Sequence, residues 1–263
     1  MEDDLEPFES ARLVLSNTKA TIDKIEGEVG AFIDDCIGPV REDFDAQTQE
    51  KIIFVTLKKP FPDSIRIDTY HVVSDAKHAL DQCVGDAAIL LGRADAKGLH
   101  FPIGKTVTDF DREIKRRLKK VHTGLRDHLV GLDTNERGNP DLYKFLSMSG
   151  PNKHQRIVGI TAKSNMTISG SHLGMMTGVV LNIGKWHRKK NEIEFIRIRP
   201  GGSISGRGHL YDALKPSLRV TFRDGGPPFD EPLPTTLRRF CGECERVFSG
   251  IESETEHILR THL

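Results

Sequence analysis

The sequence predicts an α+β fold, because apolar residues at helical spacing fill its first half and short β-branched runs fill its second half. A mainly helical part with one β-hairpin is expected over residues 1–155, and a β-rich part over 156–223. A Pro/Gly-rich linker at 224–236 then leads to a small zinc-finger-like tail at 237–263. The 263 residues are 37% hydrophobic and 29% charged, which is typical of globular chains and excludes the disordered class.

The first predicted element is one long helix. From Phe8 to Cys36, apolar residues recur every seven positions, a second apolar series lies between them, and Gly38-Pro39 ends the pattern. Such a helix needs a long surface to pack on. That surface belongs either to another helix of the chain or to the same helix of a second copy, so a dimer is one interpretation.

A hairpin and a second helix are predicted next. Runs 51–58 and 65–73 are rich in β-branched residues and flank the turn signal at 60–64, so we expect them to pair as two strands. Ser74 is then expected to cap a helix that ends at Gly92.

Three more helices are predicted before the β-rich part. Thr108 and Asp111 form a capping pair at the start of one, and a second covers 125–132. A third begins at Pro140, with Asn139 as its cap. Short strands are expected further on, at 157–160, 166–168, 179–183, 193–198 and 218–222.

The order of these pieces resembles a widespread group of bacterial proteins to which no activity is assigned. The shared motifs are the Ala-Leu-Asp core in His78–Asp81, the Phe-Pro-Ile step at Phe101–Ile103 and a Lys-His-Arg-like motif in Asn152–Arg156. The resemblance covers about 8–160, with an echo at Gly225–Pro228, and departs from the group's pattern where Gln155 separates histidine from arginine. It implies this architecture and a bacterial origin, and no activity.

A metal site is predicted at the C-terminal end of the chain. Cys241 and Cys244 are separated by two residues, and His257 and His262 by four, which is the ligand spacing of a C2H2 zinc finger. Phe248 stands where that family keeps its core aromatic residue, so the tail resembles such a finger. We expect a structural Zn²⁺ ion rather than a DNA reader, because no arginine or asparagine stands at the base-reading positions.

The alternative for this tail is one continuous amphipathic helix. Leu237, Phe240, Cys244 and Val247 all fit its apolar stripe. Against the helix stand two glycines, Gly242 and Gly250, each of which costs about 1 kcal/mol in a helix interior. The ligand spacing therefore favours zinc.

Basic residues suggest nucleic acid as an alternative partner. The net charge is zero, but residues 1–50 carry a charge of −10 and residues 151–200 one of +7. The predicted helix at 112–120 holds six cations in nine residues, and the segment 185–190 places Trp186 beside four more. A solvated helix face is the favoured interpretation of the first patch, because no aromatic residues for base stacking lie between its cations. The candidate nucleic-acid contacts are Arg112, Lys115, Arg116, Arg117, Lys119 and Lys120.

No set of residues in the sequence predicts catalysis. The glycine-rich segment 201–208 lacks the Lys-Ser/Thr pair of a phosphate-binding loop. His154, between Lys153 and Arg156, suggests a metal-independent RNase, but the sequence shows no second base for it. We therefore expect a non-enzymatic binding or interaction protein with a structural zinc site and an unidentified protein partner or self-association. The acidic N-terminus and the lack of a long apolar run indicate the cytoplasm and no membrane.

Overall fold

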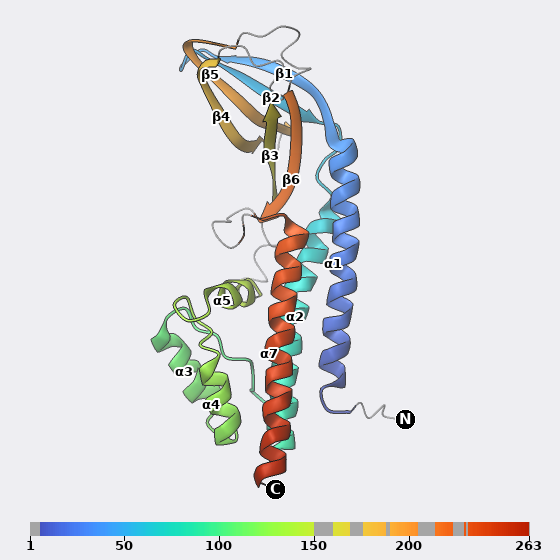
Figure 1. Ribbon diagram of the computed structural model, residues 1–263, viewed down its shortest axis with the longest axis vertical. Helices are drawn as coiled ribbons and strands as arrows, with labels where there is room; N and C mark the ends of the chain where they lie inside the picture. Colours follow the sequence, from blue (N-terminus) through green and yellow to red (C-terminus); the bar gives the residue numbers. More distant parts are fainter. Residues whose placement is uncertain are drawn as a thin grey trace. The chain divides into compact units, whose positions relative to one another are not determined.

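The computed structural model describes residues 6–149, 160–168, 176–187, 190–204, 214–222, 229 and 231–262 (Figure 1). Its helices and antiparallel strands confirm the mixed α+β class. The chain divides into two compact units. Unit 1 comprises Met1–Ile25, Arg66–Val158 and Pro234–Leu263, and unit 2 comprises Glu26–Ile65 and Gly159–Leu233. Among the described helices, none is long and apolar enough to cross a bilayer.

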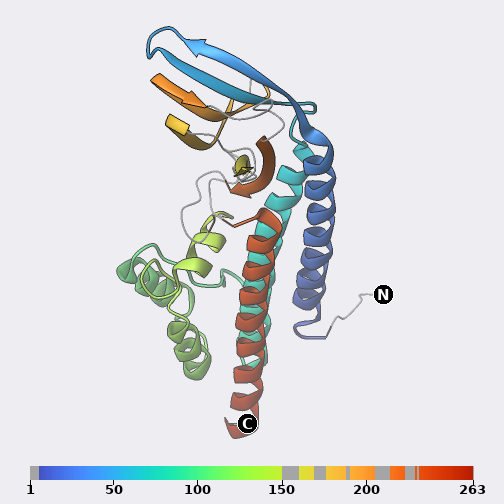
Figure 2. The same ribbon diagram turned by 45° about the horizontal axis from the view of Figure 1, so that its top comes forward.

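Three long helices build the core of unit 1. Their segments in this unit lie side by side (Figures 1 and 2). Lys24 of the first helix pairs with Asp68 of the second at 2.8 Å, and Lys19 pairs with Glu245 of the last at 2.5 Å. The partner surface of the long N-terminal helix is therefore supplied by the same chain. The helices are α1 (Glu9–Cys36), α2 (Asp63–Leu90) and α7 (Leu233–His262).

Helix α1 begins and ends as the heptad pattern predicts. Along its buried stripe, Ala11, Ile25 and Cys36 are completely inaccessible to solvent, and Phe8 just before the helix packs edge-on against Phe248 of α7. Burying each large apolar side chain contributes about 1.5–3 kcal/mol to folding, so this stripe holds the helix in place.

The predicted hairpin is wrong in its second strand. The hairpin is formed by β1 (Ile37–Asp45) and β2 (Glu50–Leu57), which pair antiparallel. Residues 65–73 instead belong to α2, in which Thr69 and Val73 face the core at helical spacing. Burial of this face outweighs the β propensity of the branched residues. As a result, Ser74 lies inside α2 rather than at its start.

The end of α2 and the three shorter helices follow the sequence closely. Gly92 has a φ of +91°, which suits glycine after a helix. Helix α3 begins two residues earlier than predicted, because Thr106 and Asp109 form the capping box. Asn139 caps the last short helix as expected, accepting the Leu142 amide. The helices are α3 (Val107–Arg117), α4 (Thr123–Gly131) and α5 (Pro140–Ser147).

Unit 2 contains two antiparallel sheets, which confirms that the second half of the chain is rich in strands. The larger sheet has the order β1-β2-β5-β4, and β3 pairs with β6 in the smaller one. Ile53, Val55, Ile193 and Ile196 form buried parts of the larger sheet. Residues 224–228 and 230 of the predicted linker lie outside the described residues, as does the start of the first predicted strand. The end of the predicted linker is wrong, because helix α7 already begins at Leu233. The new strands are β3 (Ile160–Ile168), β4 (Met176–His187), β5 (Glu192–Ile204) and β6 (Leu214–Phe222).

Candidate functional site

The four predicted zinc ligands all fall on helix α7. This helix is continuous from Leu233 to His262, so the amphipathic helix, not the zinc finger, is the arrangement found. Cys241 and His257 are 16 residues apart, which corresponds to about 24 Å along a helix. Ligands of one tetrahedral zinc ion lie within about 4 Å of each other, because each is about 2.0–2.3 Å from the metal. The predicted finger is therefore wrong, because one unbroken helix keeps its ligands apart.

Burial also sets the chemistry of the two cysteines. Cys241 and Cys244 are 2% and 0% exposed, and they belong to the core face of α7. Burial raises the pKa of Cys241 to about 11, with a further contribution from nearby Glu245, and it raises the pKa of Cys244 as well. In the absence of a metal both side chains are consequently neutral thiols at physiological pH. His257 lies exposed on α7, and the side chain of His262 is outside the described residues. Among the residues described, no three His, Cys, Asp or Glu side chains are grouped to hold a metal ion.

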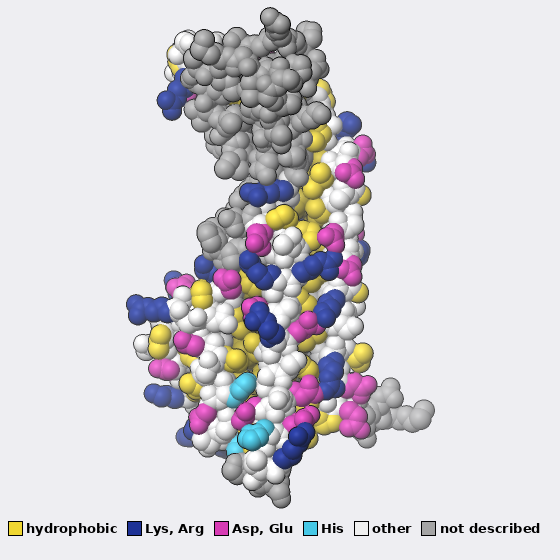
Figure 3. Space-filling model, in the orientation of Figure 1, with side chains coloured by type: hydrophobic (Ala, Val, Ile, Leu, Met, Phe, Trp, Pro, Cys, Tyr) yellow, Lys and Arg dark blue, Asp and Glu magenta, His cyan; other side chains and the backbone are white. Residues whose placement is uncertain are grey.

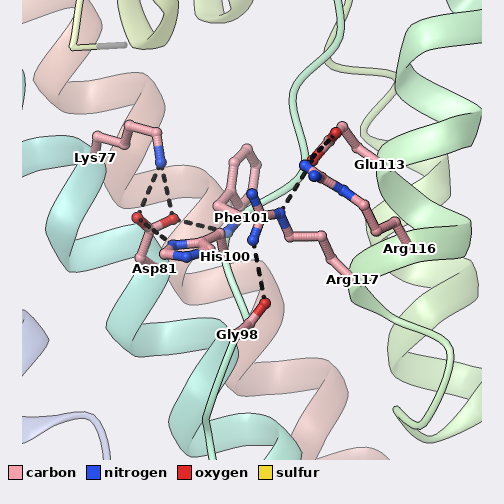
Figure 4. A network of polar contacts seen from close by, with 8 residues as sticks. All are labelled: Lys77, Asp81, Gly98, His100, Phe101, Glu113, Arg116 and Arg117. Carbon is pink, nitrogen blue, oxygen red and sulfur yellow. Dashed lines mark hydrogen bonds and ion pairs between the residues drawn. The ribbon is translucent and has the colours of Figure 1, made fainter. Parts of the chain in front are cut away.

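The polar side chains of unit 1 instead gather at a cleft between α2, the loop 98–106 and α3 (Figure 4). The cleft has a volume of about 680 Å³. Ser74, Lys77, His78 and Asp81 contribute to it from α2, where the spacing of three, four and seven residues puts them on one helix face. Phe101, at 2% exposure, lies at its base.

Asp81 ties the loop to α2. Its Oδ1 accepts the Phe101 amide at 2.8 Å, and both of its oxygens accept the Lys77 ammonium at 2.9 and 3.1 Å. Its Oδ2 lies 3.2 Å from His100 Nδ1 (Figure 4). Because only 18% of the Asp81 side chain is exposed, these charge-assisted bonds are shielded from water. The loop backbone and the His100 ring therefore hold a fixed position beside α2.

The opposite wall is the arginine-rich face of α3. Glu113 accepts hydrogen bonds from Arg116 at 2.5 and 2.6 Å and from Arg117 at 3.0 Å, and Arg117 Nη1 also donates to the Gly98 carbonyl (Figure 4). Burial alone would raise the pKa of Glu113, but the two arginines together outweigh it and hold that pKa below its usual value. The carboxylate is therefore ionised and fixes both guanidinium groups at the cleft.

The start of α3 is held by close backbone packing. A Cβ added to Gly104 would overlap the Phe110 amide, so only glycine fits at this position. The Gly104 amide donates to the Thr134 carbonyl at 3.1 Å. The hydroxyl of Thr106 donates to Asp109 and lowers the pKa of that carboxyl group, so this residue is also ionised. These contacts fix the loop end on which Lys105 is carried.

The cleft has an excess of positive charge. Five cations and three carboxylates are found among its described lining residues, which leaves an excess of two positive charges while both histidines are neutral. In addition, Ser74 Oγ is buried and has no hydrogen-bond partner within the described part of the chain. The cations are Lys77, Lys105, Arg112, Arg116 and Arg117, and the carboxylates are Asp81, Asp109 and Glu113.

The six predicted nucleic-acid contacts divide into two sets. Arg112 lines the cleft with Arg116 and Arg117, and each of these arginines pairs with a carboxylate of α3. The lysines of the run are exposed, and they make no ion pair with any described residue; they are Lys115, Lys119 and Lys120. On the face of unit 1 in Figure 3, by contrast, basic and acidic side chains are mixed along α1 and α7.

The other sequence candidates do not join this cleft. The tip 185–190 belongs to unit 2, where His187 lies 3.5 Å from the buried carboxylate of Glu194. Residues 188 and 189 and the Trp186 side chain are outside the described part, as are His154 and 205–208 of the glycine-rich segment.

In the sequence, His78–Asp81 is only a motif of the resemblance, and it does not predict that α2 lines a site. The available signal is the polar series from Ser74 to Asp81 on an otherwise apolar helix, but the capping preference of Ser74 predicts a helix start instead. His100 lies in a loop, where no periodicity indicates what it faces. Comparison of the chain with protein-family models, with curated proteins and with solved structures gives no match.

Proposed function

We propose that this protein binds single-stranded nucleic acid, and that the cleft between α2 and α3 holds its phosphates. The excess of positive charge in the cleft is the observation that carries this proposal. Phosphate groups are the common anionic ligands of such clefts, and arginine recognises them through several N–H donors at once. Arg112 and Arg116 each make an ion pair within α3, which leaves further donors on each guanidinium group for a ligand.

The dimensions of the cleft favour a single strand. Ligand pockets usually measure about 300–1,000 Å³, and the cleft falls within this range, so it accommodates about one nucleotide unit but not a double helix. Beyond it, Lys115, Lys119 and Lys120 provide further exposed cations for neighbouring phosphates. Because Phe101 is 2% exposed, it offers no face for base stacking. Recognition would therefore rest on the backbone and tolerate different base sequences.

The proposal keeps the expectation of a binding protein but changes its basis. A zinc site at the C-terminal end no longer supports it, because α7 separates the ligands. The basic residues of α3 support nucleic-acid binding more strongly in the structure than in the sequence. In the structure they line a cleft together with residues of α2, and do not only form a solvated helix face.

The test compares two double variants that remove the same charge. Arg112→Ser/Arg116→Ser removes two cleft arginines, and Arg246→Ser/Arg260→Ser removes two arginines of α7 that do not line the cleft. All four are exposed and paired with a carboxylate three or four residues earlier, so the pairs differ mainly in location. Binding of a labelled single-stranded oligonucleotide would be followed by fluorescence anisotropy over a range of salt concentrations.

We expect the cleft variant to lose about 100-fold in affinity, since it removes two charge-assisted contacts of about 1.5 kcal/mol each. Its dependence of log K on log salt concentration should become shallower by about 1.4, which corresponds to two lost phosphate contacts on a single strand. The α7 variant should bind as the parent does. Equal losses in both variants, or no salt-dependent binding by the parent, would contradict the proposal.

A further inference from the structure

The cleft contains a histidine that its neighbour holds in one orientation. His100 Nδ1 lies 3.2 Å from Asp81 Oδ2 (Figure 4). Because Lys77 and the Phe101 amide also donate to it, Asp81 is an ionised carboxylate, which can only accept hydrogen bonds. Nδ1 of His100 must therefore carry the proton, and in the neutral ring Nε2 keeps the lone pair. A base oriented by a third group in this way is the usual arrangement at sites of acid–base catalysis.

A second histidine lines the same cleft. His78 stands three residues before Asp81, one turn away on the same face of α2. Its side chain is exposed and makes no hydrogen bond or ion pair with the described residues. The imidazole of histidine both accepts and donates protons near neutral pH, so two of them in one cleft can serve as base and acid. The cleft therefore contains the second base that the sequence did not show.

Anchoring of the loop alone does not account for the contact between Asp81 and His100. Asp81 is satisfied in that role by Lys77 and the Phe101 amide, whereas the His100 side chain is 47% exposed and adds little to the anchor. Both histidines line the cleft together with the arginines of α3, of which Arg112 and Arg116 can stabilise extra negative charge on a phosphorus centre.

From this juxtaposition we propose that the cleft cleaves RNA by internal transesterification; the inference rests on the proposed function, because the strand must first bind. His100 Nε2 takes the proton of a ribose 2′-hydroxyl, and the 2′-oxygen forms a bond to the adjacent phosphorus. The bond from phosphorus to the 5′-oxygen breaks, and that oxygen takes a proton from protonated His78. The products are a 2′,3′-cyclic phosphate and a 5′-hydroxyl. Proton exchange with water then restores both histidines.

The substrate follows from this chemistry. The attacking nucleophile is the 2′-hydroxyl, so the same strand made of DNA should bind but remain intact. Asp81 is a positioning residue, because it acts on His100 and not on the substrate.

The experiment uses a ribo-oligonucleotide and a deoxyribo-oligonucleotide of the same sequence, with the full chain and four variants purified in parallel. His100→Ala and His78→Ala should each lower the cleavage rate by about 100-fold or more. Asp81→Asn should lower it by about tenfold and alter the pH–rate profile, which a purely structural role would not do. His71→Ala, which changes an exposed α2 histidine outside the cleft, should cleave as the parent does. Mass spectrometry would identify the cyclic phosphate.

The outcomes separate the two proposals. If the parent binds both oligonucleotides and cleaves neither, the cleavage inference is overturned and nucleic-acid binding stands. If the parent binds neither, the proposed function itself fails. Cleavage that persists unchanged in both His100→Ala and His78→Ala would come from another source and would also overturn the inference. A thermal unfolding curve for each variant confirms that any loss of cleavage is not a loss of fold.

Discussion

Helix α7 and the cleft between α2 and α3 belong to the same unit but differ in where their potential ligand-binding side chains lie, which is in the core for the two cysteines of α7 and at the surface of a cleft on α2 and α3. On α7, Cys241 and Cys244 carry metal-binding side chains at a known ligand spacing, yet both point into the core. At the cleft, no motif of known chemistry is present, yet Asp81, His100 and Glu113 line one site from three separate segments. The difference shows that whether a side chain can bind a ligand depends on its surroundings in the folded chain. The spacing of residues in the sequence predicts those surroundings only where the local fold is the expected one.

Ionisation follows the same division. Burial keeps the thiols of Cys241 and Cys244 neutral, because removing a thiolate from water is unfavourable. Asp109 and Glu113 remain ionised, because hydrogen bonds from hydroxyl and guanidinium donors lower the pKa values of their carboxyl groups. The cleft therefore presents ionised groups to a ligand, whereas the two buried cysteines of α7 contribute to the core.

The largest expected effect tests whether α7 is a core helix. Phe240 of α7 stacks on Phe145 of α5 with ring centres 4.4 Å apart, and both are fully buried. Phe240→Ala should lower the free energy of unfolding by about 3–5 kcal/mol, because it leaves a cavity in the core. Urea unfolding followed by circular dichroism would measure this loss. Leu13→Ala, at an α1 side chain that is 56% exposed, should cost much less; equal costs would show that α7 does not pack as described.

A second prediction compares two of the predicted zinc ligands. Cys244→Ser places a hydroxyl without a partner in a fully buried position, which should cost about 1–3 kcal/mol. His257→Ala removes an exposed side chain and should change stability by less than about 0.5 kcal/mol. Thermal unfolding with and without a zinc chelator would measure both. A zinc finger would behave differently, since each substitution would remove one ligand and cause a similar, chelator-sensitive loss.

Local signals in the sequence predicted much of the fold. The heptad series identified α1, the Asn139-Pro140 step identified α5, and strand-rich texture identified the second half of the chain. They failed at residues 65–73, where β-branched residues occur in a helix whose burial comes from distant parts of the chain. They failed again at α7, because two glycines at about 1 kcal/mol each are outweighed by one long buried face.

The cleft was only half predictable. The cations at 112–120 could be listed from the sequence, since a run of six in nine residues is evident by inspection, and four of them lie on α3. Their partners could not, because Asp81 meets Phe101 and His100 only after the chain turns back over 20 residues. The pairing of Glu113 with Arg116 and Arg117 follows helical spacing, but only the fold shows that these arginines line a cleft.

The smallest expected effect tests the claim that the cleft carboxylates are ionised. The pKa of Glu113 is lower in the folded protein than its ordinary value of 4.5, so the ionised form stabilises the fold. This stability is present above about pH 4.5 and is lost as the pH falls through the lowered folded pKa, because the unfolded chain then binds the proton more readily. Glu113→Gln should lose under about 1 kcal/mol at neutral pH, since the side chain is partly exposed. Urea midpoints measured from pH 7 down to pH 3 should fall less steeply in the variant than in the parent. If the two slopes are equal, Glu113 does not contribute through its charge, and the two arginines are held at the cleft by other contacts.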